Sequence, residues 1–121
     1  MQEYTIKFYE KADGSKPIEN FLNELDIRMR AKMMREIQLL KTNGPSLRMP
    51  HSRFLEDGIF ELRAQMGSNI CRSLYFFYSG KNIILTNGFV KKSQKTPPKE
   101  IALAKEYRGD YIARVRGDLN G

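Results

Sequence analysis

The chain is poor in the residues that build metal centres and nucleophilic active sites. Its 121 residues include one cysteine, Cys71, and one histidine, His51. A single cysteine excludes an internal disulfide and a zinc site made of several thiolates. Because no histidine, cysteine, aspartate or glutamate recurs at metal-ligand spacing, we expect no metal site and no cofactor. Cys71 lies inside an apolar strand pattern and His51 in a polar loop, so a cysteine–histidine or serine–histidine catalytic set is disfavoured. A supporting role for His51 stays open, because it comes directly before the predicted sheet.

Long apolar runs and phosphate-binding glycine motifs are also missing. No run approaches the roughly 18 residues that span a membrane, and residues 1–4 lack the basic-then-apolar start of a secretory signal. No Walker loop or dinucleotide-binding glycine pattern occurs. We therefore expect a cytoplasmic protein with no membrane partner, organised as a single domain over residues 1–121.

Positive charge is in excess and is concentrated in the C-terminal third of the chain. The formal net charge is +7, of which residues 81–121 contribute +5 and residues 1–80 contribute +2. An asymmetry of this kind favours an anionic partner, RNA or DNA. The alternative is an ordinary solvated basic surface, but here the lysines cluster at an element boundary.

Hydrophobic periodicity predicts the element order β-α-α-β-β-β-α. The predicted elements are a strand over 4–9, a short helix from Pro17, a longer helix from Asp26 to Asn43, strands over 59–66, 70–78 and 83–90, and a helix from about Pro97. Residues 46–57 have the composition of a loop. This order is typical of an α+β domain, in which a helical hairpin packs on a mainly antiparallel sheet made of the first strand and a three-strand meander.

Two features of this pattern predict where the core lies. Met29, Met33, Ile37 and Leu40 recur at helical spacing after Asp26, a good N-cap residue, so we expect them to face the sheet. The aromatic run over 75–78 alternates between the two faces of its strand, and core packing is its simplest role.

Two arginines are predicted to lie side by side on neighbouring strands. Gly67-Ser68 fits a two-residue hairpin turn, which pairs position 66 with 69 and therefore Arg63 with Arg72. Like charges directly opposite each other cost stability, and a bound anion would relieve that cost. The alternative is structural: Arg63 pairs with Glu61 or another carboxylate, and Arg72 donates to backbone carbonyls.

Three lysines follow the last predicted strand and precede the last helix. Lys91, Lys92 and Lys95 are fixed at the end of a buried element, next to the positive end of a helix dipole. Flexible ammonium groups in such a place favour a polyanion. The alternative is a solvated loop before the helix.

Three segments resemble one known family. They are GIFELR (58–63), RSLYFF (72–77) and GFVKKSQKTP (88–97), and IALAK (101–105) continues the match. Together they resemble the RelE/ParE toxin superfamily, most of all its phage-associated HigB-like branch. The resemblance covers nearly the whole chain in element order, and is specific from Gly58 to Tyr111.

The resemblance implies the toxin of a type II toxin–antitoxin pair, with a cognate antitoxin that contains a helix-turn-helix domain. It further implies a ribosome-dependent endoribonuclease that cuts mRNA without a metal, by attack of the ribose 2′-hydroxyl on the adjacent phosphate. The family's site positions correspond to Arg63, Arg72, Lys91, Lys92 and Lys95. We expect Arg63, Arg72, Lys91 and Lys92 to act in catalysis, and Gln94, Lys95 and Lys99 to bind RNA.

The proton-transfer group and the function class stay open at this point. Crowding among cations is one route by which a lysine such as Lys91 becomes a usable base. Tyr107 or Tyr111 could serve only if the last helix folds back over the site. The alternatives to a nuclease are a ParE-like inhibitor that binds DNA gyrase without catalysis, and a non-catalytic RNA-binding module.

Overall fold

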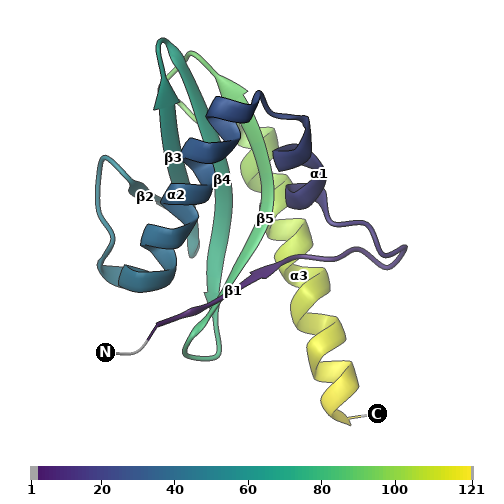
Figure 1. Cartoon of the computed structure of the whole chain (residues 1–121). Helices are drawn as coiled ribbons and strands as arrows, with labels where there is room; N and C mark the ends of the chain where they lie inside the picture. Colours follow the sequence, from purple (N-terminus) through teal and green to yellow (C-terminus); the bar gives the residue numbers. More distant parts are fainter. Residues whose placement is uncertain (1–2, 121) are drawn as a thin grey trace.

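A computed structural model describes residues 3–120, in which five strands form one mixed sheet with helices on both faces (Figure 1). The elements are β1 (Thr5–Phe8), α1 (Pro17–Glu24), α2 (Ile27–Asn43), a short 3-10 helix η1 (Gly44–Ser46), β2 (Ser52–Glu56), β3 (Ile59–Met66), β4 (Asn69–Tyr78), β5 (Asn82–Lys91) and α3 (Pro98–Asn120). The strand order is β1-β5-β4-β3-β2. The predicted α+β class is confirmed.

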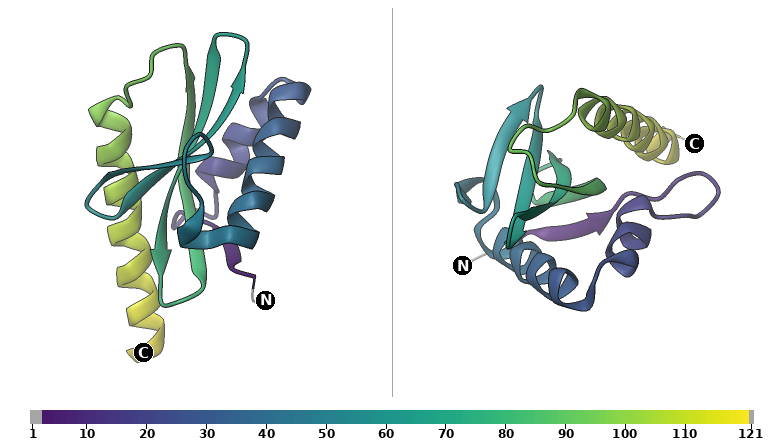
Figure 2. Two further views of the ribbon diagram at one scale, coloured as in Figure 1. Left: turned by 90° about the vertical axis from the view of Figure 1, so that its left-hand side faces the viewer. Right: turned by 90° about the horizontal axis from the view of Figure 1, so that it is seen from above.

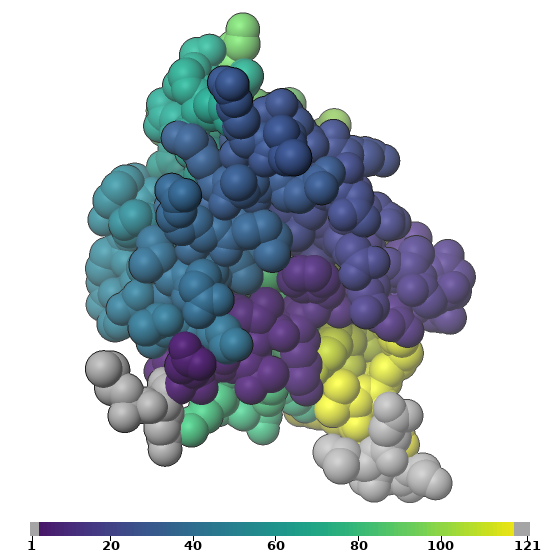
Figure 3. Space-filling view, viewed as in Figure 1, coloured from purple at the N-terminus to yellow at the C-terminus, as the bar shows by residue number. Residues whose placement is uncertain are grey.

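Helices α1 and α2 cover one face of the sheet. The Asp26 carboxylate accepts hydrogen bonds from the backbone amides of Arg28 and Met29, at 3.2 and 3.4 Å, and so caps α2 as expected. The predicted stripe is buried, since Met33 and Leu40 are 0% exposed. Burial of each such side chain contributes about 1.5–3 kcal/mol. Figure 3 shows the residues of α1, α2 and β1 covering most of this side of the molecule.

Helix α3 covers part of the opposite face (Figure 2). Its Ala104 is fully buried, and Tyr107 and Tyr111 pack against the same core cluster. The aromatic run of β4 supplies both layers, because Tyr75 and Phe77 pack toward the α1–α2 side while Phe76 packs toward α3. The two-sided core packing predicted for this run is confirmed.

Two parts of the predicted sheet differ from the structure. Residues 46–57 contain a fifth strand, β2, and are not one continuous loop. β2 is a short edge strand with an irregularity near Leu55, and Phe54 is 56% exposed, so its alternation is weak in sequence. β1 pairs with β5 in parallel, whereas β3, β4 and β5 pair antiparallel. No hairpin links β1 to β5, so local sequence cannot fix their relative direction.

The loop between β5 and α3, residues 92–97, lies at the same end of the sheet as the β3–β4 turn (Figure 2). The β4–β5 turn lies at the other end. Within residues 3–120, none of the helices has the length and apolar character that crossing a bilayer requires.

Candidate functional site

The site is built on adjacent strands, where basic side chains share one face of the sheet. Met66 pairs with Asn69, and Arg63 lies directly opposite Arg72. The predicted arginine pair is therefore confirmed. On the other side of β3, Arg53 of β2 lies opposite Glu61. Residues directly opposite each other in a sheet point to the same face. We call Arg53, Arg63 and Arg72, with the carboxylate between them, the arginine cluster.

Glu61 is the centre of this cluster. Its side chain is 0% exposed, and one of its oxygens, Oε1, lies 3.2 Å from Arg72 Nε. The other oxygen, Oε2, lies 3.6 Å from Arg63 Nε and 3.4 Å from Arg53 Nη2. Three guanidinium groups thus share one carboxylate, so the cluster keeps a positive excess. Breaking a buried pair of this kind is costly, because the remaining charges have no water to solvate them.

Arg72 is the most deeply buried member of the cluster, with 0% of its side chain exposed. Its Nη2 donates to the carbonyl oxygen of Ser93, whereas its Nη1 is buried without a hydrogen-bond partner among the described residues. Its Nε is close to Glu61 but lacks hydrogen-bond geometry. Burial lowers the pKa of Arg72, Glu61 opposes that shift, and Arg63 adds to it. A buried donor without a partner favours an acceptor of negative charge.

The loop at residues 92–97 lies over the arginine cluster and is held by it. Arg63 Nη2 donates to Gln94 Oε1 at 2.6 Å, and Arg53 Nη2 donates to the Gln94 carbonyl oxygen at 3.3 Å. The buried Thr96 hydroxyl donates to Glu61 Oε1. The arginines therefore face the segment that carries the lysines.

Part of the alternative prediction, in which both arginines have purely structural partners, also agrees with these contacts. Arg63 does pair with Glu61, and Arg72 does donate to a backbone carbonyl. However, Glu61 contacts both of these guanidinium groups through Nε. The Nη2 atom of each donates to the loop, so the Nη ends, which bind phosphate oxygens in a fork, are not held by Glu61.

The predicted lysines lie around this loop in solvent. Lys91 ends β5, Lys92 and Lys95 are in the loop, and Lys99 lies in the first turn of α3; all four are exposed. Among the side chains of residues 3–117, no carboxylate oxygen lies within 4.0 Å of the ammonium group of any of these four lysines. The structure therefore places Arg63 beside Arg72 and in contact with Gln94. It leaves the lysines as a solvated rim, and the proton-transfer role of Lys91 stays a prediction.

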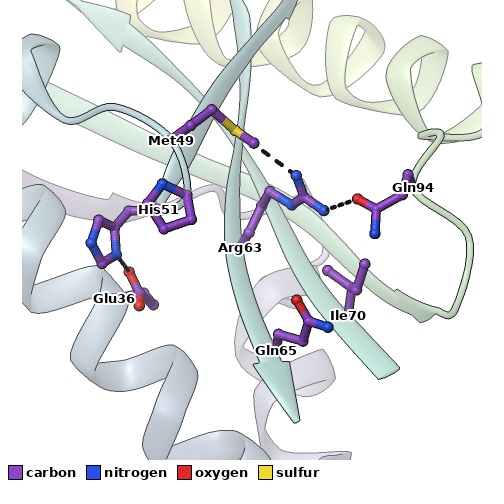
Figure 4. A pocket seen from close by; sticks show the side chains of 8 residues that line it. Glu36, Met49, His51, Arg63, Gln65, Ile70 and Gln94 are labelled. Carbon is purple, nitrogen blue, oxygen red and sulfur yellow. Dashed lines mark hydrogen bonds and ion pairs between the residues drawn. The ribbon is translucent and has the colours of Figure 1, made fainter. Parts of the chain in front are cut away.

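A pocket of about 410 Å³ adjoins Arg63, next to the part of β3 that extends beyond its pairing with β2 (Figure 4). Its lining residues are Glu36, Met49, Pro50, His51, Arg63, Gln65, Ile70 and Gln94. His51 Nδ1 lies 2.8 Å from Glu36 Oε2, and Figure 4 shows this pair on the opposite side of β3 from the Arg63 guanidinium. An imidazole held by a carboxylate is oriented by it. His51 thus forms part of the pocket wall, although its ring is directed away from Arg63.

Sequence reasoning missed Arg53, Glu61 as the centre of the cluster, and the His51–Glu36 pair. Arg53 lies in the segment predicted as a loop, and its partners come from β3 and from residues 94 and 96. One local feature could have predicted the role of Glu61: it lies two residues before Arg63, and therefore on the same face of the strand.

The remaining candidates for chemistry lie in the core. Tyr107 stacks on Tyr9 with 4.6 Å between ring centroids, and Tyr111 packs edge-on against Phe76. Burial raises the pKa of the Cys71 thiol to about 12, so Cys71 is not a nucleophile at neutral pH. Among the side chains that the structure describes, residues 3–117, no group of three histidine, cysteine, aspartate or glutamate residues could hold a metal.

Two comparisons with known proteins bear on the identity of the chain. A search of the curated proteins found no match. The family described as phage-derived protein Gp49-like (DUF891) matches residues 20–108, a range that contains the arginine cluster and the lysine-bearing loop. The chain therefore belongs to the Gp49-like family, a toxin-like family related to the RelE and HigB type.

Proposed function

We propose that this protein is the toxin of a type II toxin–antitoxin pair, of the HigB-like branch, and that it cuts mRNA on the ribosome as a metal-independent endoribonuclease. The Gp49-like family is toxin-like and typically pairs with an antitoxin. The observation that carries the nuclease assignment is the arginine cluster, in which the Nη2 atoms of Arg63 and Arg72 donate to a loop with exposed lysines.

The proposed chemistry needs positive charge more than it needs a nucleophile from the protein. The ribose 2′-hydroxyl attacks the adjacent phosphorus, the bond to the 5′ oxygen of the next nucleotide breaks, and a 2′,3′-cyclic phosphate forms. The proton of the 2′-hydroxyl is removed, and the 5′ oxygen receives one. Negative charge develops on the non-bridging and leaving oxygens, where fixed cations stabilise it.

Arg63 and Arg72 would supply that stabilisation. Hydrogen bonds to charged groups contribute about 1.5–3 kcal/mol each, so each arginine accounts for about one to two decades in rate. Glu61 would hold both guanidinium groups from their Nε side in advance, which avoids reorganisation during the reaction. The phosphate would bind Arg63 Nη1 and Arg72 Nη1 and take the place of the Ser93 carbonyl, while Gln94 keeps its contact with Arg63 Nη2. The exposed Lys91, Lys92, Lys95 and Lys99 would attract the RNA.

One observation favours a second candidate, a non-catalytic RNA-binding module. Arg72 is 0% exposed, and the Ser93 carbonyl already accepts a hydrogen bond from its Nη2. If the loop at residues 92–97 stays in place, only the exposed lysines reach RNA. They would then contribute to binding affinity but not to the rate of cleavage.

The test compares Lys92→Ala and Arg63→Ala with Lys81→Ala, an exposed lysine in the β4–β5 turn at the other end of the sheet. Each protein is induced briefly in a bacterial cell, and the 5′ ends of messages are mapped. We expect new ends inside translated regions with the wild type and with Lys81→Ala, and at least tenfold fewer with the other two variants. Purified messages without ribosomes should remain uncut.

Three results would contradict the assignment. If Arg63→Ala cuts messages as well as the wild type does, the arginine cluster does not take part in catalysis. RNA binding without new message ends would favour the binding module. Intact messages together with broken chromosomal DNA would favour inhibition of gyrase.

A further inference from the structure

The pocket beside Arg63 has walls of a different character from the cationic rim. Its residues include two amides, Gln65 and Gln94, and the apolar side chains of Met49 and Ile70 (Figure 4). Glu36, the carboxylate of this pocket, is engaged by His51. A volume of about 410 Å³ is within the range of small-ligand sites. Such a mixture suits a flat heteroaromatic group better than a second phosphate.

Fixed partners set the polarity that each amide presents to the pocket. A guanidinium only donates hydrogen bonds, so the Gln94 atom that contacts Arg63 is the oxygen, Oε1. The Gln94 amide nitrogen is then left to donate to a ligand. A backbone carbonyl only accepts, so the Gln65 Nε2 contact with the Gly67 carbonyl, at 3.2 Å, leaves Gln65 Oε1 to accept. In the part of the chain whose side chains are described, residues 3–117, the Gln94 amide nitrogen and Gln65 Oε1 have no other hydrogen-bond partner.

One donor and one acceptor match the edge of a nucleobase. Every base presents a neighbouring donor and acceptor on its Watson–Crick edge when it is unpaired. RNA-binding proteins also stack unpaired bases on the plane of an arginine guanidinium, and Arg63 lines this pocket. Met49 contributes a soft, adaptable wall, with its sulfur 3.9 Å from Arg63 Nη1.

We propose that this pocket binds the base of a nucleotide next to the scissile phosphate, with Gln65 and Gln94 on its polar edge and Arg63 on its ring face. This inference rests on the proposed function for the position of the scissile phosphate. The base contact itself does not require cleavage. Arg63 would then touch both the phosphate and a neighbouring base, which ties the site of cutting to the identity of that base.

The test measures binding of short single-stranded RNAs to the purified protein by fluorescence anisotropy, with one nucleotide at a time made abasic. We expect one position at which loss of the base weakens binding to the wild type by about 5- to 100-fold. In Gln65→Ala this loss should shrink to less than threefold. Gln65 is exposed, so thermal unfolding of the variant should match the wild type. Gln38→Ala, an exposed glutamine on α2, is the matched control and should behave as the wild type does.

Mapping of message ends with the same proteins separates this inference from the proposed function. Base preference beside the cut should flatten in Gln65→Ala and persist in Gln38→Ala. If the wild type cuts no message but the abasic effect depends on Gln65, the proposed function fails and the base pocket stands. If no abasic position depends on Gln65, the base pocket is refuted, whether or not messages are cut. Weaker capture of a cognate antitoxin by Gln65→Ala, with unchanged RNA binding, would also refute it and assign the pocket to the antitoxin.

Discussion

Replacement of Glu61 by glutamine tests the arrangement on which the site depends. Glu61 is 0% exposed, and its carboxylate lies within 3.2 to 3.6 Å of three guanidinium groups. Glutamine keeps the volume and can still accept from Thr96, so little cavity is created. It removes the one negative charge, and removal of a partner from a buried ion pair costs about 3–5 kcal/mol. Domains of this size have a total stability of about 5–15 kcal/mol.

We expect Glu61→Gln to lower the free energy of unfolding by about 3–5 kcal/mol, which corresponds to a fall of about 12–20 °C in Tm. Urea unfolding followed by circular dichroism measures it. Glu56→Gln is the matched control: its carboxylate is 2.6 Å from Lys105 Nζ but 55% exposed. A pair in solvent contributes at most about 1 kcal/mol.

A second measurement on the same variant addresses anion binding. Inorganic phosphate should raise the Tm of Glu61→Gln more than that of the wild type, because an anion that binds only the folded state stabilises it. If Glu61→Gln unfolds within about 1 kcal/mol of the wild type, and phosphate has no larger effect on it, then Glu61 does not offset the charges of the arginine cluster.

Three further predictions concern the core. Since burial raises the pKa of Cys71 to about 12, iodoacetamide at pH 8 should modify it only after unfolding; rapid labelling of the folded protein would contradict this. Burial raises the pKa of Tyr9 and of Tyr75 to about 12, above the ordinary value near 10, so the stability they contribute below pH 10 should be lost as the pH rises toward 12. The free energy of unfolding should therefore fall less steeply between pH 10 and 12 in Tyr75→Phe than in the wild type. An equal pH dependence in the two proteins would contradict the contribution of Tyr75. Gly88→Ala places a methyl group 2.9 Å from the Arg72 carbonyl oxygen and against the Phe21 ring, which should cost about 1–3 kcal/mol in the free energy of unfolding. Gly109→Ala, in open space on α3, should instead add about 0.5–1 kcal/mol, and equal effects of the two changes would contradict the packing argument.

Much of the fold follows from contacts between residues close in sequence. The Gly67-Ser68 turn alone fixes the register of β3 and β4, because a two-residue hairpin leaves no freedom in pairing. The Asp26 cap and the helical spacing from Met29 to Leu40 likewise need only one turn of chain at a time. These local rules place Arg63 opposite Arg72 before any tertiary contact is known.

The environment of those arginines depends on segments far apart in the chain. Arg53 reaches the cluster only because β2 pairs with β3, which places Arg53 opposite Glu61. The loop at residues 92–97 meets the cluster because α3 packs on the face of the sheet that carries it. The pocket combines residues from α2, from the segment before β2, from β3, from β4 and from the β5–α3 loop.

The sequence by itself determined the element order apart from β2, the arginine pair and the excess of positive charge in the last third of the chain, since each depends on local spacing or composition. Only the tertiary structure decided the direction of β1, the burial of Glu61 among three arginines, and the pocket beside them. Those features are set by contacts between segments separated by tens of residues, and no local pattern encodes which distant segment will meet which.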